Sequence, residues 1–364
     1  MSATVEAPAT ATSATGTAPT EGHLGLSSTP PLLPADLRDR LLARVTTVAD
    51  RDEIEVTSPF TEQLLGSIPS GTGDDVAEAV RRARAAQPAW AALGPRERSR
   101  VLMRAHDLVF ERQAEVLDLI QLESGKVRAH AYEEVADTAM VAAYYARTGG
   151  RHLADRRRGG ALPGLTQTRE VRHPKGVVGF IAPWNYPLSM SITDAIPALM
   201  AGNGCVIKPA QTTPFTALWV VDVLIEAGVP ADLLQVVTGK GSAIGTPLIE
   251  QCDFVTFTGS TEVGRSVAAQ AGEKLIGCAL ELGGKNASIV LDDADLDRAV
   301  AGSLQGCFAS AGQLCISIER LFVHRSVVDE FTRRFVAAVE DLQLSAALAY
   351  GGEMGSLQSR SQLE

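Results

Sequence analysis

Gly176-Val177-Val178-Gly179-Phe180-Ile181-Ala182 is the stretch of sequence that decides the fold. A short, unbroken apolar run of this kind is typical of a strand that is buried on both faces. Similar runs follow at residues 204–208, 233–238 and 254–259. Helix candidates lie between and after them, at residues 191–200, 214–227, 245–251 and 261–272. Buried strands separated by helices predict a doubly wound parallel sheet of the dinucleotide-binding α/β class.

The segments upstream of this sheet predict mainly helices. Asp36 can cap a helix that carries Leu37 and Leu41 on one side, and residues 53–56 alternate like a strand before a turn at residues 58–61. Amphipathic helices are predicted from Asp74, after Pro95, and from about 127 to 147, the last one stopping before Gly149-Gly150.

Residues 1–33 are predicted to be a disordered tail. Residues 1–29 are rich in Ala, Thr, Ser and Pro and contain no Lys or Arg. They lack the charged start and apolar segment of a secretory signal, and also the arginines of a transit peptide.

The composition favours a globular protein with material for two domains, because 45% of its 364 residues are hydrophobic. Its 33 Lys+Arg against 43 Asp+Glu give a net charge of -10, which argues against nucleic acid as a partner. Arg156-Arg157-Arg158, the one dense basic patch, is interpreted as a solvated turn or, alternatively, as a subunit contact. No apolar run reaches the roughly 18 residues that a membrane span requires.

The cysteine pattern indicates neither a disulfide framework nor a zinc site, since five cysteines form an odd set with no Cys-x-x-Cys pair. We therefore expect a cytoplasmic location. Four of the five are interpreted as buried, small apolar residues: Cys205, Cys252, Cys278 and Cys307.

Cys315, Glu281 and Asn185 are the candidate catalytic residues. The small and polar neighbours of Cys315 suggest an accessible loop, where a thiolate could attack a carbonyl. Asn185 follows the 176–182 strand and could donate to the resulting oxyanion, or could be an ordinary turn asparagine. Glu281, at the end of an apolar run, is expected to be desolvated and suited to act as a base, or else to pair with Lys285. Together these three groups can make and hydrolyse a thioester.

Two further features point to a dinucleotide. Gly259 and Ser260 end a predicted strand and Gly264 lies in the next helix, so backbone N–H groups there can approach a pyrophosphate. Lys208 closes another strand, where such sheets hold the adenosine ribose; the alternative is an ordinary exposed lysine.

The chain contains five sequence blocks that resemble the aldehyde dehydrogenase superfamily, and they occur in the order of the family pattern. They are Pro183-Trp184-Asn185, Lys208-Pro209-Ala210, Phe257-Thr258-Gly259-Ser260, Glu281-Leu282-Gly283-Gly284-Lys285 and Gly312-Gln313-Leu314-Cys315. The resemblance covers about residues 56–364. Around Cys315 and at Ser124-Gly125-Lys126 the sequence looks most like that of bacterial enzymes assigned as NADP-dependent succinate-semialdehyde dehydrogenases.

This resemblance implies a role for each candidate residue. Cys315 would be the nucleophile, Asn185 and the backbone N–H of Cys315 would form the oxyanion hole, and Glu281 would activate water against the thioester. A glutamate at this position favours release of the free acid over transfer of the acyl group to coenzyme A. Cofactor binding would fall to Trp184, Lys208, Gln211, Gly259, Ser260 and Gly264.

Departures from the family pattern qualify what the resemblance implies. Gln211 stands where members that prefer NAD usually have a glutamate, so we expect NADP, with NAD possible. Thr193 and Ala309 stand where succinate-semialdehyde enzymes have arginines. The substrate is therefore expected to be a semialdehyde such as succinate semialdehyde or, alternatively, an apolar or aromatic aldehyde.

The chain ends at Glu364, whereas the family pattern continues. We expect an NAD(P)-binding domain over residues 34–280 and a C-terminally truncated α/β catalytic domain over residues 281–364. The family implies a homo-oligomer, although the strand that pairs across subunits would be missing. Two alternatives remain. One is a truncated cofactor-binding protein without turnover. The other is a cysteine hydrolase, but that needs a histidine near Cys315, and His324 is interpreted as structural.

Overall fold

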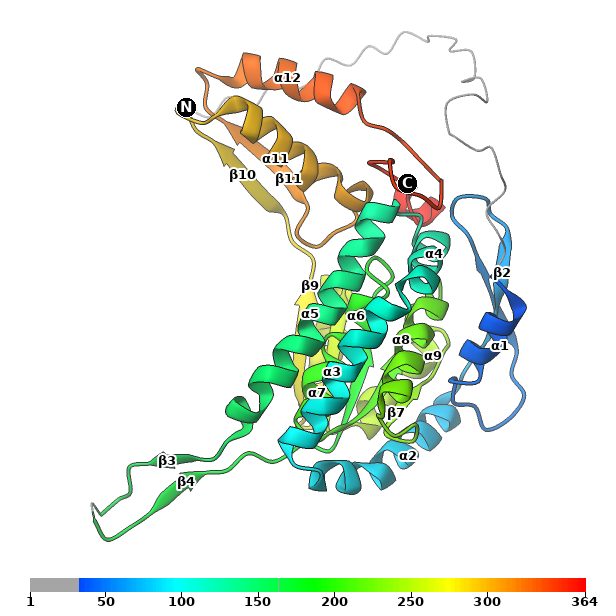
Figure 1. Ribbon diagram of the computed structural model, residues 1–364, viewed down its shortest axis with the longest axis vertical. Helices are drawn as coiled ribbons and strands as arrows, with labels where there is room; N and C mark the ends of the chain where they lie inside the picture. The colour runs from blue at the N-terminus through cyan, green and yellow to red at the C-terminus, as the bar shows by residue number, and fades with distance from the viewer. Residues whose placement is uncertain (1–32, 163) are drawn as a thin grey trace.

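The computed structural model describes residues 33–162 and 164–364 and is built around a five-stranded sheet (Figure 1). The sheet has the order β7-β6-β5-β8-β9, and all neighbouring strands are parallel. Its strands are β5 (Val177–Ile181), β6 (Gly204–Lys208), β7 (Leu234–Val236), β8 (Phe254–Gly259) and β9 (Gly277–Leu282). The predicted doubly wound parallel sheet is confirmed.

Helices cover both faces of this sheet, because its strands are apolar on both sides. On one face Val178, Phe180 and Ile207 pack with α3 (Pro95–Glu111), α5 (Arg128–Leu153), α7 (Ala195–Met200) and α8 (Pro214–Ala227). On the other face Val206 and Val255 pack with α2 (Gly73–Ala92), α9 (Gly241–Gln251) and α10 (Thr261–Glu273). Because all five strands are parallel, their carboxyl ends lie at one open edge of the sheet.

Two hairpins extend from this core. β1 (Glu53–Thr57) and β2 (Leu64–Pro69) form an antiparallel pair around the predicted turn. β3 (Arg156–Arg158) pairs with β4 (Thr168–Glu170) in a ribbon that projects from the molecule in Figure 1. The arginine run is exposed but forms a strand, so its interpretation as a turn is wrong; the subunit contact stays a prediction.

A second, smaller α/β unit follows the first sheet. β10 (Asn286–Val290) and β11 (Ile318–Val323) form a parallel pair. They pack with α11 (Leu296–Phe308) and α12 (Val328–Glu340) around a separate apolar cluster that includes Val290, Val300 and Phe331. A short helix, α13 (Arg360–Leu363), lies near the end of the chain. The division at residue 281 stays a prediction, although the chain does leave the first sheet after β9 ends at Leu282.

The N-terminal predictions need correction. α1 (Ala35–Leu42) begins after Pro34, and Asp36 lies inside its first turn without forming a cap. The predicted tail lies outside the described residues except for Leu33, which is buried. α4 (Gln113–Ser124) was not predicted; it ends at Gly125, whose φ of 75° closes the helix.

Two other helix predictions were wrong in their bounds. α5 continues through Gly149-Gly150 to Leu153, because Gly149 lets the helix pack directly against the side chain of Met200. The single helix predicted for residues 191–200 is divided into α6 (Ser189–Ile192) and α7. Pro197 explains this division, since it has no N–H to donate to the carbonyl of Thr193.

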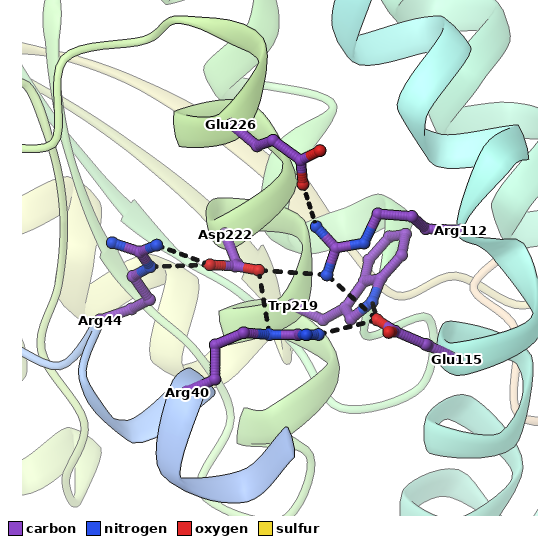
Figure 2. A network of polar contacts seen from close by, with 7 residues as sticks. All are labelled: Arg40, Arg44, Arg112, Glu115, Trp219, Asp222 and Glu226. Carbon is purple, nitrogen blue, oxygen red and sulfur yellow. Dashed lines mark hydrogen bonds and ion pairs between the residues drawn. The ribbon is translucent and has the colours of Figure 1, made fainter. Parts of the chain in front are cut away.

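A polar network fastens α1 to the rest of the molecule (Figure 2). Asp222 of α8 is 5% exposed and binds three arginines, with Arg44 at 2.7 Å, Arg112 at 3.1 Å and Arg40 at 3.4 Å. The network is completed by Glu115, Trp219 and Glu226.

Within the described residues, no helix combines the length and hydrophobicity needed to cross a bilayer.

Candidate active site

A cavity of about 580 Å³ lies at the open edge of the sheet. It is lined by the loop after β5, the start of α6, the ends of β8 and β9, residues 314–316, two residues of α5 and one residue of α13. Cys315, Glu281 and Asn185 all line this one cavity. The fold thus brings together three candidate residues that are far apart in the sequence.

Cys315 is the exposed cysteine of the chain. The turn before it has left-handed backbone at Ser310 and Ala311 as well as at Gly312. The carbonyl oxygen of Cys315 accepts a hydrogen bond of 2.7 Å from Nδ2 of Asn286, which also donates to Ser317 at 3.0 Å. The backbone around the thiol is thereby fixed while the side chain stays open to the cavity.

The other four cysteines do not line the cavity. Cys205 and Cys252 are buried as predicted, and burial raises the pKa of both thiols, to about 12 for Cys252. Cys278 and Cys307 are only half-buried, so the prediction that they are core residues is wrong. All five are free thiols.

The side-chain amide of Asn185 is directed toward the loop that carries Cys315. Its Nδ2 donates to the carbonyl oxygen of Gln313 at 2.8 Å. Because an amide nitrogen carries two hydrogens, one N–H remains for a ligand in the cavity. Asn185 is therefore fixed in place while keeping a donor available.

A buried ion pair supports the loop that carries Asn185. Nζ of Lys126 lies 2.6 Å from Oε1 of Glu134 and donates to the backbone carbonyl of Asn185 at 2.8 Å. Oε2 of Glu134 accepts from the backbone N–H of Leu188 and Ser189, at 2.8 and 3.2 Å. Burial lowers the pKa of Lys126 and raises that of Glu134, and the mutual attraction of the two charges opposes both shifts. Neither Lys126 nor Glu134 was predicted as a site residue.

Glu281 lies at the carboxyl end of β9 and lines the cavity, but it is exposed. The expectation of a desolvated carboxylate is therefore wrong. The alternative pairing with Lys285 is also wrong, because Lys285 binds Glu319 instead. Among the described residues Glu281 has no hydrogen-bond or ion-pair partner, so its carboxylate can meet water inside the cavity.

The predicted cofactor residues fall into two groups. Trp184, Lys208 and Gln211 line a second cavity of about 480 Å³, together with Lys240 and Ser242 at the start of α9. Gly259 and Ser260 line the first cavity, and Trp184 lines both. The two cavities therefore share Pro183 and Trp184 in their linings.

Lys208 is a buried residue of the second cavity, and Gly264 lies outside both cavities. Lys208 is 7% exposed, and burial lowers its pKa to about 8, so the reading as an ordinary exposed lysine is wrong. Gly264 lines neither cavity. A Cβ atom there would lie 2.5 Å from Cδ2 of Leu282, so this glycine lets α10 pack against β9. Its contribution to a cofactor site would be indirect.

Glu133 and Asp137 of α5 also line the first cavity and were not predicted. Acidic residues on a helix surface are ordinary in sequence, and only the fold reveals that this face of α5 meets Cys315. No histidine belongs to the described lining of this cavity. His324 is exposed and bonds to Ser326 at 2.8 Å, so the base that a cysteine hydrolase needs is not found among these residues.

Comparison with known proteins gives consistent matches. The model of the aldehyde dehydrogenase family matches residues 46–364. A putative succinate-semialdehyde dehydrogenase [NADP(+)] of Mycolicibacterium smegmatis (strain ATCC 700084 / mc(2)155) is 46% identical over 327 residues, which are 90% of this chain and 63% of that protein. A succinate-semialdehyde dehydrogenase [NADP(+)] of Escherichia coli (strain K12) is 38% identical, over 84% of this chain and 64% of its own length.

Among solved structures, an E. coli NADP dependent enzyme superposes with a TM-score of 0.84 at 36% identity. The match covers 89% of this chain and 69% of that one. The chain spans less than two thirds of the length of the curated relatives just described.

Proposed function

The chain belongs to the aldehyde dehydrogenase family, and we propose that it oxidises an aldehyde to the carboxylic acid with NADP through a thioester on Cys315. The observation that carries this proposal is the single cavity lined by Cys315, Asn185 and Glu281. A nucleophile, an oxyanion donor and a base in one cavity are what the two halves of the reaction require.

In the first half, the sulfur of Cys315 attacks the carbonyl carbon of the aldehyde. The electron pair of the C=O bond moves to oxygen, and the free N–H of Asn185 and the backbone N–H of Cys315 donate to that oxyanion. The hydrogen bond from Asn286 to the carbonyl of Cys315 holds the backbone in position during this step. One oxyanion donor of this kind contributes about 3 kcal/mol to the stability of the transition state.

Bound NADP would supply the acceptor for the hydride that leaves the carbon as the thioester forms. The chain's own residues would hold it along the open edge of the sheet: Trp184, Lys208, Gln211, Lys240, Gly259 and Ser260. In the second half, Glu281 takes a proton from a water molecule, the hydroxyl oxygen attacks the thioester carbon, and Cys315 leaves as thiolate. The exposure of Glu281 gives this water direct access.

The preference for NADP rests on the charges around the second cavity. Two lysines, Lys208 and Lys240, and no carboxylate belong to its described lining. Gln211 is exposed there and neutral. A 2′-phosphate would therefore meet attraction and no repulsion, whereas NAD would lose that attraction without being excluded.

The aldehyde is less narrowly defined. The names of the relatives suggest succinate semialdehyde as a candidate. However, Thr193 and Ala309 supply no positive charge to pair with its carboxylate. The described lining of the active-site cavity has three carboxylates and no Lys or Arg, which disfavours an anionic substrate. Trp184, Tyr186 and Leu314 in the same lining favour an apolar or aromatic part instead.

The test is NADPH formation with a panel of aldehydes, for this chain and for Cys315→Ala. We expect aldehyde-dependent NADPH formation that the substitution abolishes, while NADP binding persists in both proteins. NADP binding without turnover in the unsubstituted chain would support the alternative of a cofactor-binding protein that lacks activity. Turnover that survives Cys315→Ala would falsify the assignment of the nucleophile.

Cytoplasmic location and homo-oligomeric assembly belong to the same proposal. A mechanism through Cys315 requires a reduced thiol, and the reducing cytoplasm preserves one.

A further inference from the structure

We propose that Glu133 and Asp137 select aldehydes that carry a positively charged group, such as an alkylammonium aldehyde. This inference rests on the proposed function, because it names the substrate class of the same cavity. It concerns the wall of the cavity formed by α5, which takes no part in the chemistry described above.

Position is the first argument. Glu133 and Asp137 are one helical turn apart on α5, so their side chains share one face of the helix. Both line the cavity that contains Cys315 and Glu281. A substrate whose carbonyl lies at Cys315 therefore extends through a space that two carboxylates border.

The second argument is that these two carboxylates lack partner side chains among the described residues. Within the described residues, neither Glu133 nor Asp137 forms an ion pair or a side-chain hydrogen bond, unlike the neighbouring Glu134, which is paired with Lys126. Asp222, a buried carboxylate, has three arginines. Asp137 is half-buried and Glu133 is exposed. A carboxylate that is partly withdrawn from water usually has such a partner, so Asp137 is suited to a cation from a ligand, and Glu133 adds a second negative charge one helical turn away.

Electrostatics of the whole cavity are the third argument. Glu133, Asp137 and Glu281 are its charged lining residues, all negative. Partial burial raises the pKa of the Asp137 carboxyl and also that of Glu133, where the Lys126 charge opposes the effect. A bound cation would replace the lost solvation, whereas a bound carboxylate would add a fourth negative charge. Met190, Leu314 and Ile316 supply apolar surface for a short aliphatic linker between the cation and the carbonyl.

The first experiment measures charge selection at Cys315 without turnover. Cys315 is labelled with three methanethiosulfonates that carry trimethylammonioethyl, methyl or sulfonatoethyl groups, and the rate at this cysteine is followed by peptide mass spectrometry. We expect the cationic reagent to react fastest and the anionic one slowest. Asp137→Asn should lower the cation-to-anion rate ratio about fivefold, and Glu133→Gln combined with Asp137→Asn about tenfold or more.

Asp329→Asn is the matched control, because it removes one charge from an exposed position on α12 outside the cavity. It should leave the rate ratio unchanged. A ratio that is the same in the unsubstituted chain, Asp137→Asn and Asp329→Asn would overturn the inference, whether or not the protein oxidises any aldehyde.

The second experiment compares 4-trimethylammoniobutanal, hexanal and succinate semialdehyde as substrates with NADP. We expect kcat/KM to be highest for the cationic aldehyde, and Asp137→Asn to lower it about fivefold while hexanal is unaffected. Equal use of the cation and hexanal overturns the inference and leaves the proposed function intact. NADPH formation with none of the three contradicts the proposed function, and the labelling ratio then decides the charge preference of the cavity separately.

Discussion

The side-chain amide of Asn286 donates to the backbone carbonyl of Cys315 at 2.7 Å, so the first residue of β10 holds the loop that carries the proposed nucleophile. Asn286 directly follows the Gly283-Gly284-Lys285 segment that leaves the first sheet. The position of the sulfur therefore depends on how the two sheets are connected.

We expect Asn286→Ala to lower kcat by roughly tenfold to a hundredfold, because the attacking sulfur would lose its fixed orientation. KM for the aldehyde and the Kd of NADPH should change little, since neither cavity loses a lining residue. Steady-state kinetics and direct NADPH binding check this. An unchanged kcat would show that the hydrogen bond does not orient Cys315.

Glu281→Gln should separate the two halves of the reaction. Formation of the thioester, with release of one NADPH per site, should persist as a rapid burst, while steady turnover falls by about 10² or more because water is no longer activated. Stopped-flow absorbance measures both phases. Loss of the burst together with turnover would place Glu281 in the first half instead.

The affinity for NADP is expected to depend on pH through Lys208. Burial lowers the pKa of this amine to about 8 in the folded chain, so the ammonium form is present below that pH and lost above it. In the proposed binding mode the positive form attracts the 2′-phosphate, so NADPH affinity should fall as the pH rises through 8; bound phosphate shifts the midpoint upward. Calorimetry from pH 7 to 10 measures this.

Lys208→Arg keeps a positive charge throughout that range and should flatten the profile, whereas Lys208→Met should be weak at every pH. NADH provides the ligand control, because it lacks the 2′-phosphate. A fall in affinity that survives in Lys208→Met would assign the titration to another group.

Asp222→Asn should destabilise the fold by about 2 kcal/mol, since three arginines would lose their shared carboxylate. This loss of stability is smaller than the cost of breaking a fully buried ion pair, because the arginines are partly exposed. Urea denaturation measures the loss, and Glu330→Gln in the exposed pairs of α12 should leave the midpoint nearly unchanged. Equal effects of the two substitutions would contradict the importance of this network.

The adjacent glycines of α5 make a matched pair. Gly149→Ala should destabilise by roughly 1 to 3 kcal/mol, because its methyl group would displace the buried side chain of Met200. Gly150→Ala should stabilise by about 0.5 to 1 kcal/mol, since a Cβ there meets only Cβ of Pro95, at 3.7 Å, and alanine favours the helix. Thermal or urea denaturation of both variants tests the contrast.

The parallel sheet could be predicted from the sequence because its strands are apolar on both faces, and so appear as unbroken runs such as Val177–Ile181. Helix ends were less predictable, since they depend on contacts between distant segments. Gly149 was expected to end a helix but instead packs against Met200. Pro197, inside an apolar run, divides a helix that periodicity alone predicts as continuous.

In the candidate site, sequence blocks identified the residues but not their surroundings. Cys315, Asn185 and Glu281 do meet in one cavity, yet their roles stay predictions. The exposure of Glu281 is the reverse of what was expected, and the burial of Lys208 rules out only the alternative of an ordinary exposed lysine, because the packing around a strand end is decided by neighbouring elements. Glu133 and Asp137 could not be found at all, since only the fold places α5 at the cavity.

The left-handed turn before Cys315 positions the sulfur, and this turn depends on contacts with distant segments. Ser310 and Ala311 adopt φ of 50° and 57°, which costs non-glycine residues roughly 1 kcal/mol or more each. The turn is held by partners from much earlier in the chain: Nδ1 of His130 accepts from the Ser310 N–H at 3.2 Å, and the hydroxyls of Tyr186 and Ser310 lie 2.9 Å apart. The bend that presents the sulfur therefore depends on contacts with α5 and with the segment after β5, so a substitution in either distant segment can displace the sulfur without touching it.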